Sequence, residues 1–182
     1  LWGSLIILGK APINGTVVSP NICPTNFIEG LTASAKTEYG GCDPTDNSGS
    51  LSYVQLKHGG SVIGAANEIN GLTLGGVGSG TNIDHIEVFA NLDDGFEFFG
   101  GNVNAKYLIS AFNDDDDFDW DQGYHGKLQF LFAIKDSTNG DRLFESDGDD
   151  ANADTDPTAR PVVYNVTSIG RGILPTSPAN AN

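Results

Sequence analysis

Hydrophobic and polar residues alternate in short runs along most of this chain, and one pattern occurs twice at a spacing of 22 residues. Residues 91–98 read Asn-Leu-Asp-Asp-Gly-Phe-Glu-Phe, and residues 113–120 read Asn-Asp-Asp-Asp-Asp-Phe-Asp-Trp. An alternating apolar run precedes each copy, at 86–90 and at 108–112, and glycine follows each copy. Each repeat therefore predicts a strand, an acidic turn, a second strand and another turn.

This repeat predicts a solenoid, because a unit of this length cannot bury its own apolar face and must stack on its neighbours. No segment shows sustained helical periodicity, so the expected fold class is all-β: a parallel β-helix with coils of about 22 residues. In the run at 50–58, the candidate core residues are Leu51, Leu56 and either Tyr53 or Val54. Further strands are expected within 5–13, 67–74, 127–134, 141–147 and 161–169.

The chain is predicted to form one β-helix domain at 1–170, followed by a tail at 171–182 that is rich in Pro, Asn and Ala. Two segments without strand patterning interrupt this domain. The first is an insertion at 14–46, which contains several prolines, and the second is an acidic loop at 147–158. Because the insertion has little apolar surface of its own, we expect it to need a covalent constraint.

Cys23 and Cys42 lie within this insertion, and their neighbours are typical of loops. A disulfide between them would close a loop of about 20 residues and stabilise the fold by about 3 kcal/mol. It would also indicate an oxidising compartment. Two buried free thiols are the alternative, and the polar surroundings favour the disulfide.

The composition limits the classes of partner. A net charge of −15 and the lack of a basic patch argue against nucleic acid and favour a cation. No apolar run approaches the length of a membrane-spanning helix. At 182 residues the chain is long enough to bury one sizeable core.

Stacked coils would place residues 22 apart above one another, at a strand spacing of about 4.8 Å. Phe96, Phe118 and Phe144 are then expected to form an inward aromatic stack, with Phe98 over Trp120. The alternating neighbours of these phenylalanines would form an outward ladder of carboxylates, namely Glu97, Asp119 and Glu145. Ionised carboxylates at that spacing repel, so this ladder needs a cation, a basic partner or a proton.

The acidic turns extend this ladder, because Asp93 and Asp94 would lie over Asp115 and Asp116. Oxygen ligands at such charge density suit Ca²⁺, in a structural rather than a catalytic role. Solvated turns that cap backbone amides are the alternative. The acidic segment 145–156 is a second candidate for one ion. The predicted metal ligands are Asp93, Asp94, Glu97, Asp114, Asp115, Asp116, Asp117 and Asp119.

Several longer motifs resemble a known group of proteins. They lie at 5–14, 39–41, 46–49, 58–60, 69–80, 93–101 and 117–120. This series is similar to secreted or lipoprotein-class parallel β-helix proteins of Gram-negative bacteria, common in the Bacteroidetes and mostly of unassigned function. The resemblance covers most of residues 5–169. It implies a right-handed β-helix and an extracellular or outer-membrane-surface location, without implying an activity.

Three functions remain in view, and the first is favoured. It is a non-enzymatic structural or adhesive protein, stiffened by Ca²⁺ and assembling end to end through its terminal coils into a filament or surface layer. The second is a carbohydrate-active β-helix enzyme, either a polysaccharide lyase or a hydrolase with Glu97 and Asp119 as its acid pair. The third is a glycan-binding module that uses the aromatics Tyr107, Tyr124 and Trp2, with His125 beside Tyr124; packing against adjacent loops is the alternative for these rings.

Overall fold

The computed structural model describes residues 2–64, 69–148 and 154–172, and these residues form two parallel sheets of five strands each. We call them the long sheet and the short sheet. The long sheet has the order β12-β10-β8-β6-β4 and contains β4 (Ser50–Lys57), β6 (Asn82–Phe89), β8 (Asn104–Ala111), β10 (Lys127–Ile134) and β12 (Val162–Ile169). The short sheet has the order β1-β5-β7-β9-β11 and contains β1 (Leu5–Leu8), β5 (Leu72–Gly75), β7 (Phe96–Phe99), β9 (Phe118–Asp121) and β11 (Phe144–Ser146).

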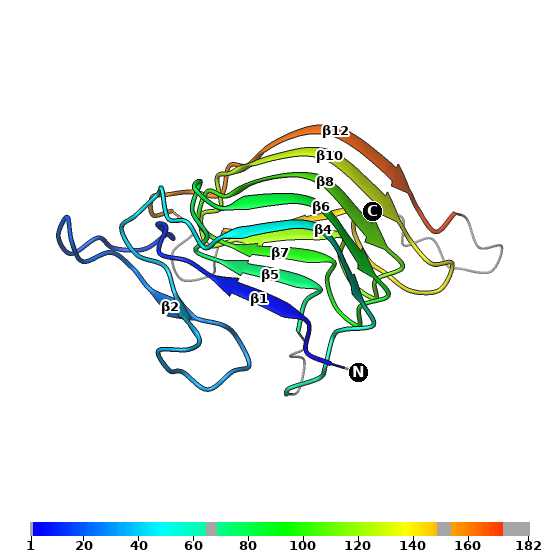
Figure 1. Ribbon diagram of the computed structural model, residues 1–182, viewed down its shortest axis with the longest axis horizontal. Helices are drawn as coiled ribbons and strands as arrows, with labels where there is room; N and C mark the ends of the chain where they lie inside the picture. Colours follow the sequence, from blue (N-terminus) through cyan, green and yellow to red (C-terminus); the bar gives the residue numbers. More distant parts are fainter. Residues whose placement is uncertain (1, 65–68, 149–153, 173–182) are drawn as a thin grey trace.

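The chain alternates between the two sheets, so that each coil adds one strand to each of them (Figure 1). All pairings within both sheets are parallel, which confirms the predicted parallel β-helix. The repeat at 22 residues appears directly in the register, where Phe96 pairs with Phe118 and Asn82 with Asn104. No helix in the described part of the chain is long and apolar enough to cross a membrane.

The core lies between the two sheets and contains the predicted aromatic stack. Phe96 and Phe118 are fully buried with ring centroids 5.3 Å apart, and Phe144 continues the stack at 5.9 Å from Phe118. Phe98 and Trp120 are register partners, also as predicted. Aromatic rings stacked in this way pack each coil against the next, which is how a repeat that cannot fold alone is stabilised.

Each long strand contains one residue with a left-handed backbone, at its fourth position. Its φ lies between 52° and 61° in every strand, at Tyr53, His85, Tyr107, Phe130 and Asn165. Such values are uncommon outside glycine, and here they interrupt the simple alternation of inward and outward side chains. As a result Val54 faces the core while Tyr53 is 79% exposed, which settles the alternative that the sequence left open.

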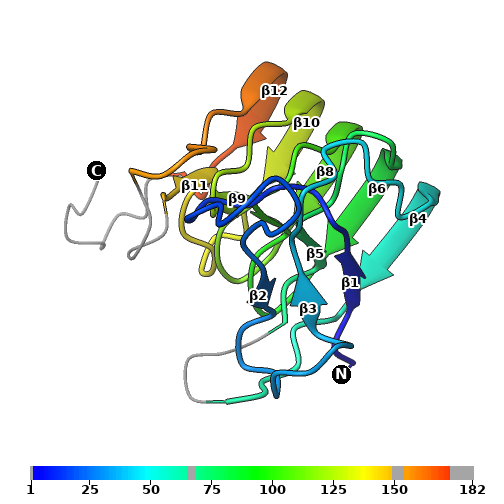
Figure 2. The ribbon, with the colours of Figure 1, turned by 90° about the vertical axis from the view of Figure 1, so that its left-hand side faces the viewer.

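The predicted insertion carries its own antiparallel pair, β2 (Asn26–Phe27) and β3 (Glu38–Tyr39). The Cys23–Cys42 disulfide is present, with the two Cα atoms 5.3 Å apart. The insertion lies on the side of the short sheet, away from the long sheet (Figure 2). It buries a second apolar cluster against that sheet, formed by Ile13, Ile28, Tyr39 and Phe99 with Ile6, Leu8 and Leu31 packed around them.

Two predicted strands are shorter than expected. The strand expected at 67–74 is β5 at Leu72–Gly75, and the strand expected at 141–147 is β11 at Phe144–Ser146. Residues 65–68 and the middle of the predicted acidic loop, 149–153, lie outside the described residues. The predicted tail at 171–182 lies outside them from residue 173 onward.

Candidate functional site

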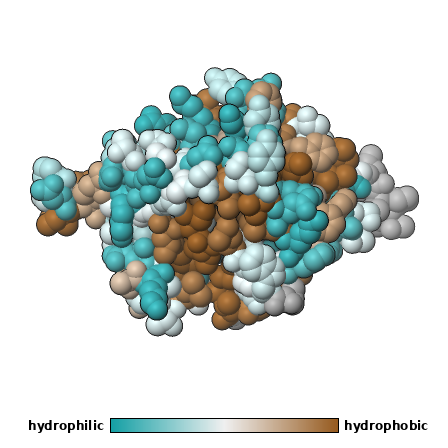
Figure 3. All heavy atoms as spheres, viewed as in Figure 1, coloured by the Kyte–Doolittle hydropathy of each residue, from teal (hydrophilic) through white to brown (hydrophobic). Residues whose placement is uncertain are grey.

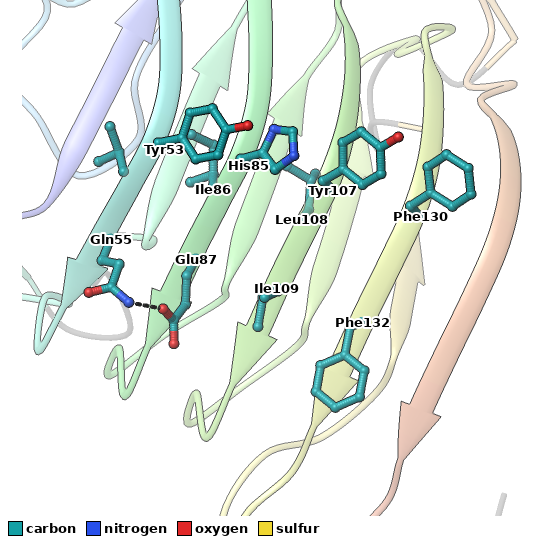
Figure 4. A pocket seen from close by; sticks show the side chains of 11 residues that line it. Tyr53, Gln55, His85, Ile86, Glu87, Tyr107, Leu108, Ile109, Phe130 and Phe132 are labelled. Carbon is teal, nitrogen blue, oxygen red and sulfur yellow. Dashed lines mark hydrogen bonds between the residues drawn. The ribbon is translucent and has the colours of Figure 1, made fainter.

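Four of the five left-handed residues of the long strands form a continuous row of rings on the outer face of the long sheet. Tyr53, His85, Tyr107 and Phe130 come from four neighbouring strands and follow one another at centroid distances of 4.3, 4.4 and 4.8 Å. Their planes lie within 23° of parallel. The row exists because parallel strands are spaced by about 4.8 Å, which is also a favourable distance for offset ring stacking. We call it the aromatic row (Figure 4).

A second row runs alongside, two residues further along each strand (Figure 4). It begins with polar Gln55 and Glu87, whose side chains are hydrogen-bonded, and continues with apolar Ile109 and Phe132. Between the two rows lies a groove of about 470 Å³. Its lining comprises Tyr53, Val54, Gln55, His85, Ile86, Glu87, Tyr107, Leu108, Ile109, Phe130 and Phe132.

Hydrogen bonds hold the middle of the aromatic row in place. The Nδ1 atom of His85 lies 2.8 Å from Oδ1 of Asp84. Asp84 also accepts hydrogen bonds from the Ser52 hydroxyl and, at 3.0 Å, from the Asn82 amide. The bond from Ser52, followed by those from His85 and Asn82, lowers the pKa of Asp84 to about 2. Asp84 is therefore ionised at neutral pH and fixes the orientation of the His85 ring.

This groove has the character of a ligand site. It is concave and mostly apolar, and a few polar groups stand at defined positions along it. Those groups are the hydroxyls of Tyr53 and Tyr107, the His85 ring, and the Gln55–Glu87 pair. An elongated ligand with both apolar faces and hydroxyl groups would match such a lining. Sugars have this amphipathic character.

Of the residues predicted as ligand contacts, only Tyr107 lines the groove. Tyr107 is in the aromatic row and 39% exposed. The expectation that Tyr124 is exposed is wrong, because its ring is fully buried at 4.6 Å from Phe98 and its hydroxyl donates to the Val103 carbonyl. His125 is partly exposed beside it, with Nδ1 2.8 Å from the Gly123 carbonyl oxygen. Trp2 is exposed but is not among the residues that line the groove.

Sequence reasoning missed Tyr53, His85 and Phe130 as members of the row. Each is the fourth residue of its strand, but the strand bounds come from the structure, so this shared position could not be read from the sequence. The row also does not repeat one residue type, because one member is a histidine and another a phenylalanine. A search for exposed tyrosines alone therefore does not find it.

The acidic residues lie elsewhere, in the short sheet and in the turns that precede it. Glu97, Asp119 and Glu145 are register partners, as the predicted ladder requires. Carboxylate oxygens approach within 4.8 Å of one another in three groups: Asp93–Asp94–Asp115, Asp94–Glu97–Asp119 and Asp115–Asp116–Asp141.

Two of the predicted metal ligands are outside these groups. Asp114 accepts a hydrogen bond from the Asn139 amide at 2.9 Å. Asp117 is fully buried, lies 3.3 Å from the Lys135 ammonium, and accepts a hydrogen bond from Ser110 at 2.6 Å. Their side chains are therefore engaged with neutral or basic neighbours.

Burial dominates the electrostatics of these acids. It raises the pKa of Asp94 to about 9 and that of Asp119 to about 6, and it raises the pKa of Glu97 well above its ordinary value. Burial, followed by the neighbouring Asp116, also raises the pKa of Glu145 to about 7. A basic side chain reaches only part of the region: Arg142 Nη1 lies 3.5 Å from Asp116 and 2.7 Å from Glu145.

Two sheets of stacked parallel strands with a groove on one outer face define a parallel β-helix protein. A family model described as a pectate-lyase-like β-helix domain matches residues 1–179. The chain therefore belongs to the pectate-lyase-like β-helix domain family. No curated protein and no solved structure matches the chain. The membership supports the parallel β-helix part of the resemblance, while the Bacteroidetes and lipoprotein part stays a prediction.

Proposed function

We propose that this chain is an extracellular glycan-binding domain that holds a neutral polysaccharide in the groove between the aromatic row and the second row. The observation that carries the proposal is the unbroken stack of four rings across β4, β6, β8 and β10, which forms one wall of that groove. A row with this spacing presents similar contacts at regular intervals to a chain of repeating sugar units. The disulfide is consistent with the extracellular location.

The charge of the site favours a neutral glycan over an acidic one. Glu87 is a carboxylate in the described lining of the groove, and Asp84, ionised at neutral pH, stands beside the aromatic row. The chain as a whole carries a formal charge of −15. An anionic polysaccharide would be repelled by both the local and the overall field.

Binding is favoured over hydrolysis because of where the carboxylates are. A glycosidase needs two of them flanking the scissile bond. Glu97 and Asp119, the pair expected for a hydrolase, belong to the short sheet and are at most 9% exposed. In its described lining the groove contains Glu87 as its carboxylate, with His85 and Gln55 as polar neighbours.

Affinity electrophoresis and calorimetry on a panel of neutral and acidic polysaccharides test this proposal. Tyr107→Ala removes a ring in the middle of the row and is expected to weaken binding about 2- to 10-fold, the loss of one or two ring contacts. Tyr164→Ala is the matched control, since Tyr164 is an exposed tyrosine of the same sheet outside the groove. Unchanged affinity in Tyr107→Ala, tighter binding of acidic glycans, or release of shorter products would each contradict the proposal.

A structural or adhesive role on a Gram-negative cell surface, with end-to-end association, is a second part of the proposal. The edge strands β4 and β12 both have eight residues and both bend at their fourth position, so one could continue the sheet of another copy. Apolar atoms gather in the middle of the face where β1 and β4 are foremost (Figure 3). The residues partly exposed in this first coil include Leu5, Ile7, Leu51 and Val54.

Light scattering and electron microscopy at increasing protein concentration test the association. Linear oligomers are expected to form, and a charge in the edge strand, Val166→Lys, is expected to prevent them. Val166 is 37% exposed, so that variant should fold. Dispersed monomers of the unsubstituted chain at high concentration would exclude this part of the proposal without affecting the glycan site.

A further inference from the structure

The three groups of carboxylates differ in what compensates their charge. Arg142 lies 3.5 Å from Asp116 and 3.2 Å from Asp141, so the third group already has a cation. The first group contains Asp115, which is exposed to solvent. In the middle group Asp94, Glu97 and Asp119 are 8%, 6% and 9% exposed. None of the ion pairs within residues 2–64, 69–148 and 154–172 includes any of these three side chains.

Asn70 provides a second, independent observation at this group. Its side chain is 4% exposed and its Nδ2 donates to Oε2 of Glu97, which fixes the amide beside one of the three carboxylates. The other amide atom, Oδ1, has no hydrogen-bond partner among the described residues, and neither has Oδ1 of Asp119. Buried oxygens are nearly always paired, because an unpaired one loses its hydration without replacement. Unpaired buried oxygens beside carboxylates are the kind of atoms that coordinate a cation.

We propose that Asp94, Glu97, Asp119 and the amide oxygen of Asn70 form a binding site for one divalent cation, best matched by Ca²⁺. The ligand set consists only of oxygen atoms, which favours a hard cation over a transition metal. Three carboxylates supply enough negative charge for an ion with a charge of two. Ca²⁺ accepts irregular coordination by carboxylate and amide oxygens, whereas Mg²⁺ demands a near-ideal octahedron.

The surroundings explain why a cation is needed at this point. The carboxylates of Asp94, Asp119, Asp121 and Glu29 all act electrostatically on Glu97. Glu29 belongs to the disulfide-stapled insertion, so the insertion brings further negative charge toward the site. Bound protons are the alternative way to neutralise these acids, and a titration with Ca²⁺ distinguishes a proton from a metal ion.

Such an ion would connect three successive coils. Asn70 lies two residues before β5, Glu97 is in β7 and Asp119 is in β9, and these strands are neighbours in the short sheet. The aromatic groove lies on the long sheet. Cation binding is therefore independent of the glycan proposal, and either can fail without the other.

Calorimetric titration of EDTA-treated protein with CaCl₂ and with MgCl₂, together with thermal unfolding, tests the site. We expect one Ca²⁺ per chain and a rise in the unfolding midpoint of about 5–10 °C at one hundred times the dissociation constant. Mg²⁺ should bind more weakly. Glu97→Gln and Asp119→Asn should abolish both the heat and the midpoint shift. Asp141→Asn is the matched control and should retain both, because Asp141 is an exposed member of the group that Arg142 compensates.

Loss of the Ca²⁺ response in Glu97→Gln and Asp119→Asn is informative only if those variants fold. Glu97→Gln keeps the shape of the side chain and replaces a buried carboxyl group with a neutral amide that needs no bound proton, so in EDTA it should unfold at or above the midpoint of the unsubstituted chain. Three results would overturn the proposal: no Ca²⁺ bound to the unsubstituted chain, an unchanged Ca²⁺ response in Glu97→Gln, or a response lost in Asp141→Asn instead. The first result would mean that bound protons neutralise Asp94, Glu97 and Asp119. The other two would place the ion in the exposed turns.

Discussion

Replacing Lys135 is the sharpest test of how this fold tolerates its acidic turns. The Lys135 ammonium lies 3.3 Å from Oδ2 of Asp117 and donates to the backbone carbonyl of Asp115 at 2.5 Å. The side chains of Lys135 and Asp117 are 5% and 0% exposed. Oδ2 of Asp117 has no hydrogen-bond partner among the described residues, so the ammonium is what compensates it.

Lys135→Met keeps most of the volume and removes the charge. The Asp117 carboxylate is then buried without its cation, which typically costs about 3–5 kcal/mol of unfolding free energy. For a chain of this size the unfolding midpoint should fall by about 6–20 °C. The double variant Lys135→Met/Asp117→Asn should recover most of the loss, because a neutral amide can still accept the hydrogen bond from Ser110.

Urea unfolding of the four proteins in this double-mutant cycle gives the coupling energy directly. EDTA should be present throughout, so that metal binding by Asp94, Glu97 and Asp119 does not contribute to the measured free energy of unfolding. Lys127→Met, which removes an exposed lysine of β10, is the control and should change stability by less than about 0.5 kcal/mol. A cost below about 1 kcal/mol for Lys135→Met, or a double variant no more stable than the single one, would refute the reasoning.

Three further predictions follow from the core, the insertion and the buried acids. Phe118→Ala should lower the free energy of unfolding by about 3–5 kcal/mol in urea titrations, because the ring is fully buried between two others; a loss under 2 kcal/mol would contradict that packing. Replacing Cys23 and Cys42 with serine should cost about 3 kcal/mol and leave glycan affinity unchanged, because the insertion lies on the other sheet; a matching loss of affinity would disprove that separation. In EDTA, the free energy of unfolding should fall as pH rises from about 4 to about 9, because Asp94 and Asp119 keep their protons in the folded chain at pH values where the unfolded chain has lost them; equilibrium unfolding that is flat or rising with pH would refute this.

The sequence by itself determined the β-helix, the stack of Phe96, Phe118 and Phe144, and the carboxylate register of Glu97 with Asp119. The reason is geometric. A repeat of 22 residues that cannot bury its own face has to stack, and stacking converts a sequence interval into a spatial neighbour. The disulfide was predictable in the same local way, since two cysteines in one loop-like insertion have few other partners.

Tertiary structure alone decided where the site is. The aromatic row depends on a left-handed backbone at Tyr53, His85, Tyr107 and Phe130, and nothing in those side chains requires it. That conformation reverses the inward and outward assignment of every residue after it, which alternation cannot reveal. The intervals between the four residues also vary with the lengths of the turns, so the row has no constant period in the sequence. Only the register of the finished sheet brings the rings together.

Tertiary structure also decided which acids are compensated. Asp117 and Asp119 are two residues apart, yet one lies beside Lys135 and the other faces two carboxylates. Both were predicted as metal ligands, because the sequence alone does not show which acid has a basic neighbour. Asp117 lies in the turn just before β9, where the backbone carries its side chain toward the end of β10. Sequence determines how many charges a turn contains, and the fold determines which of them have a partner.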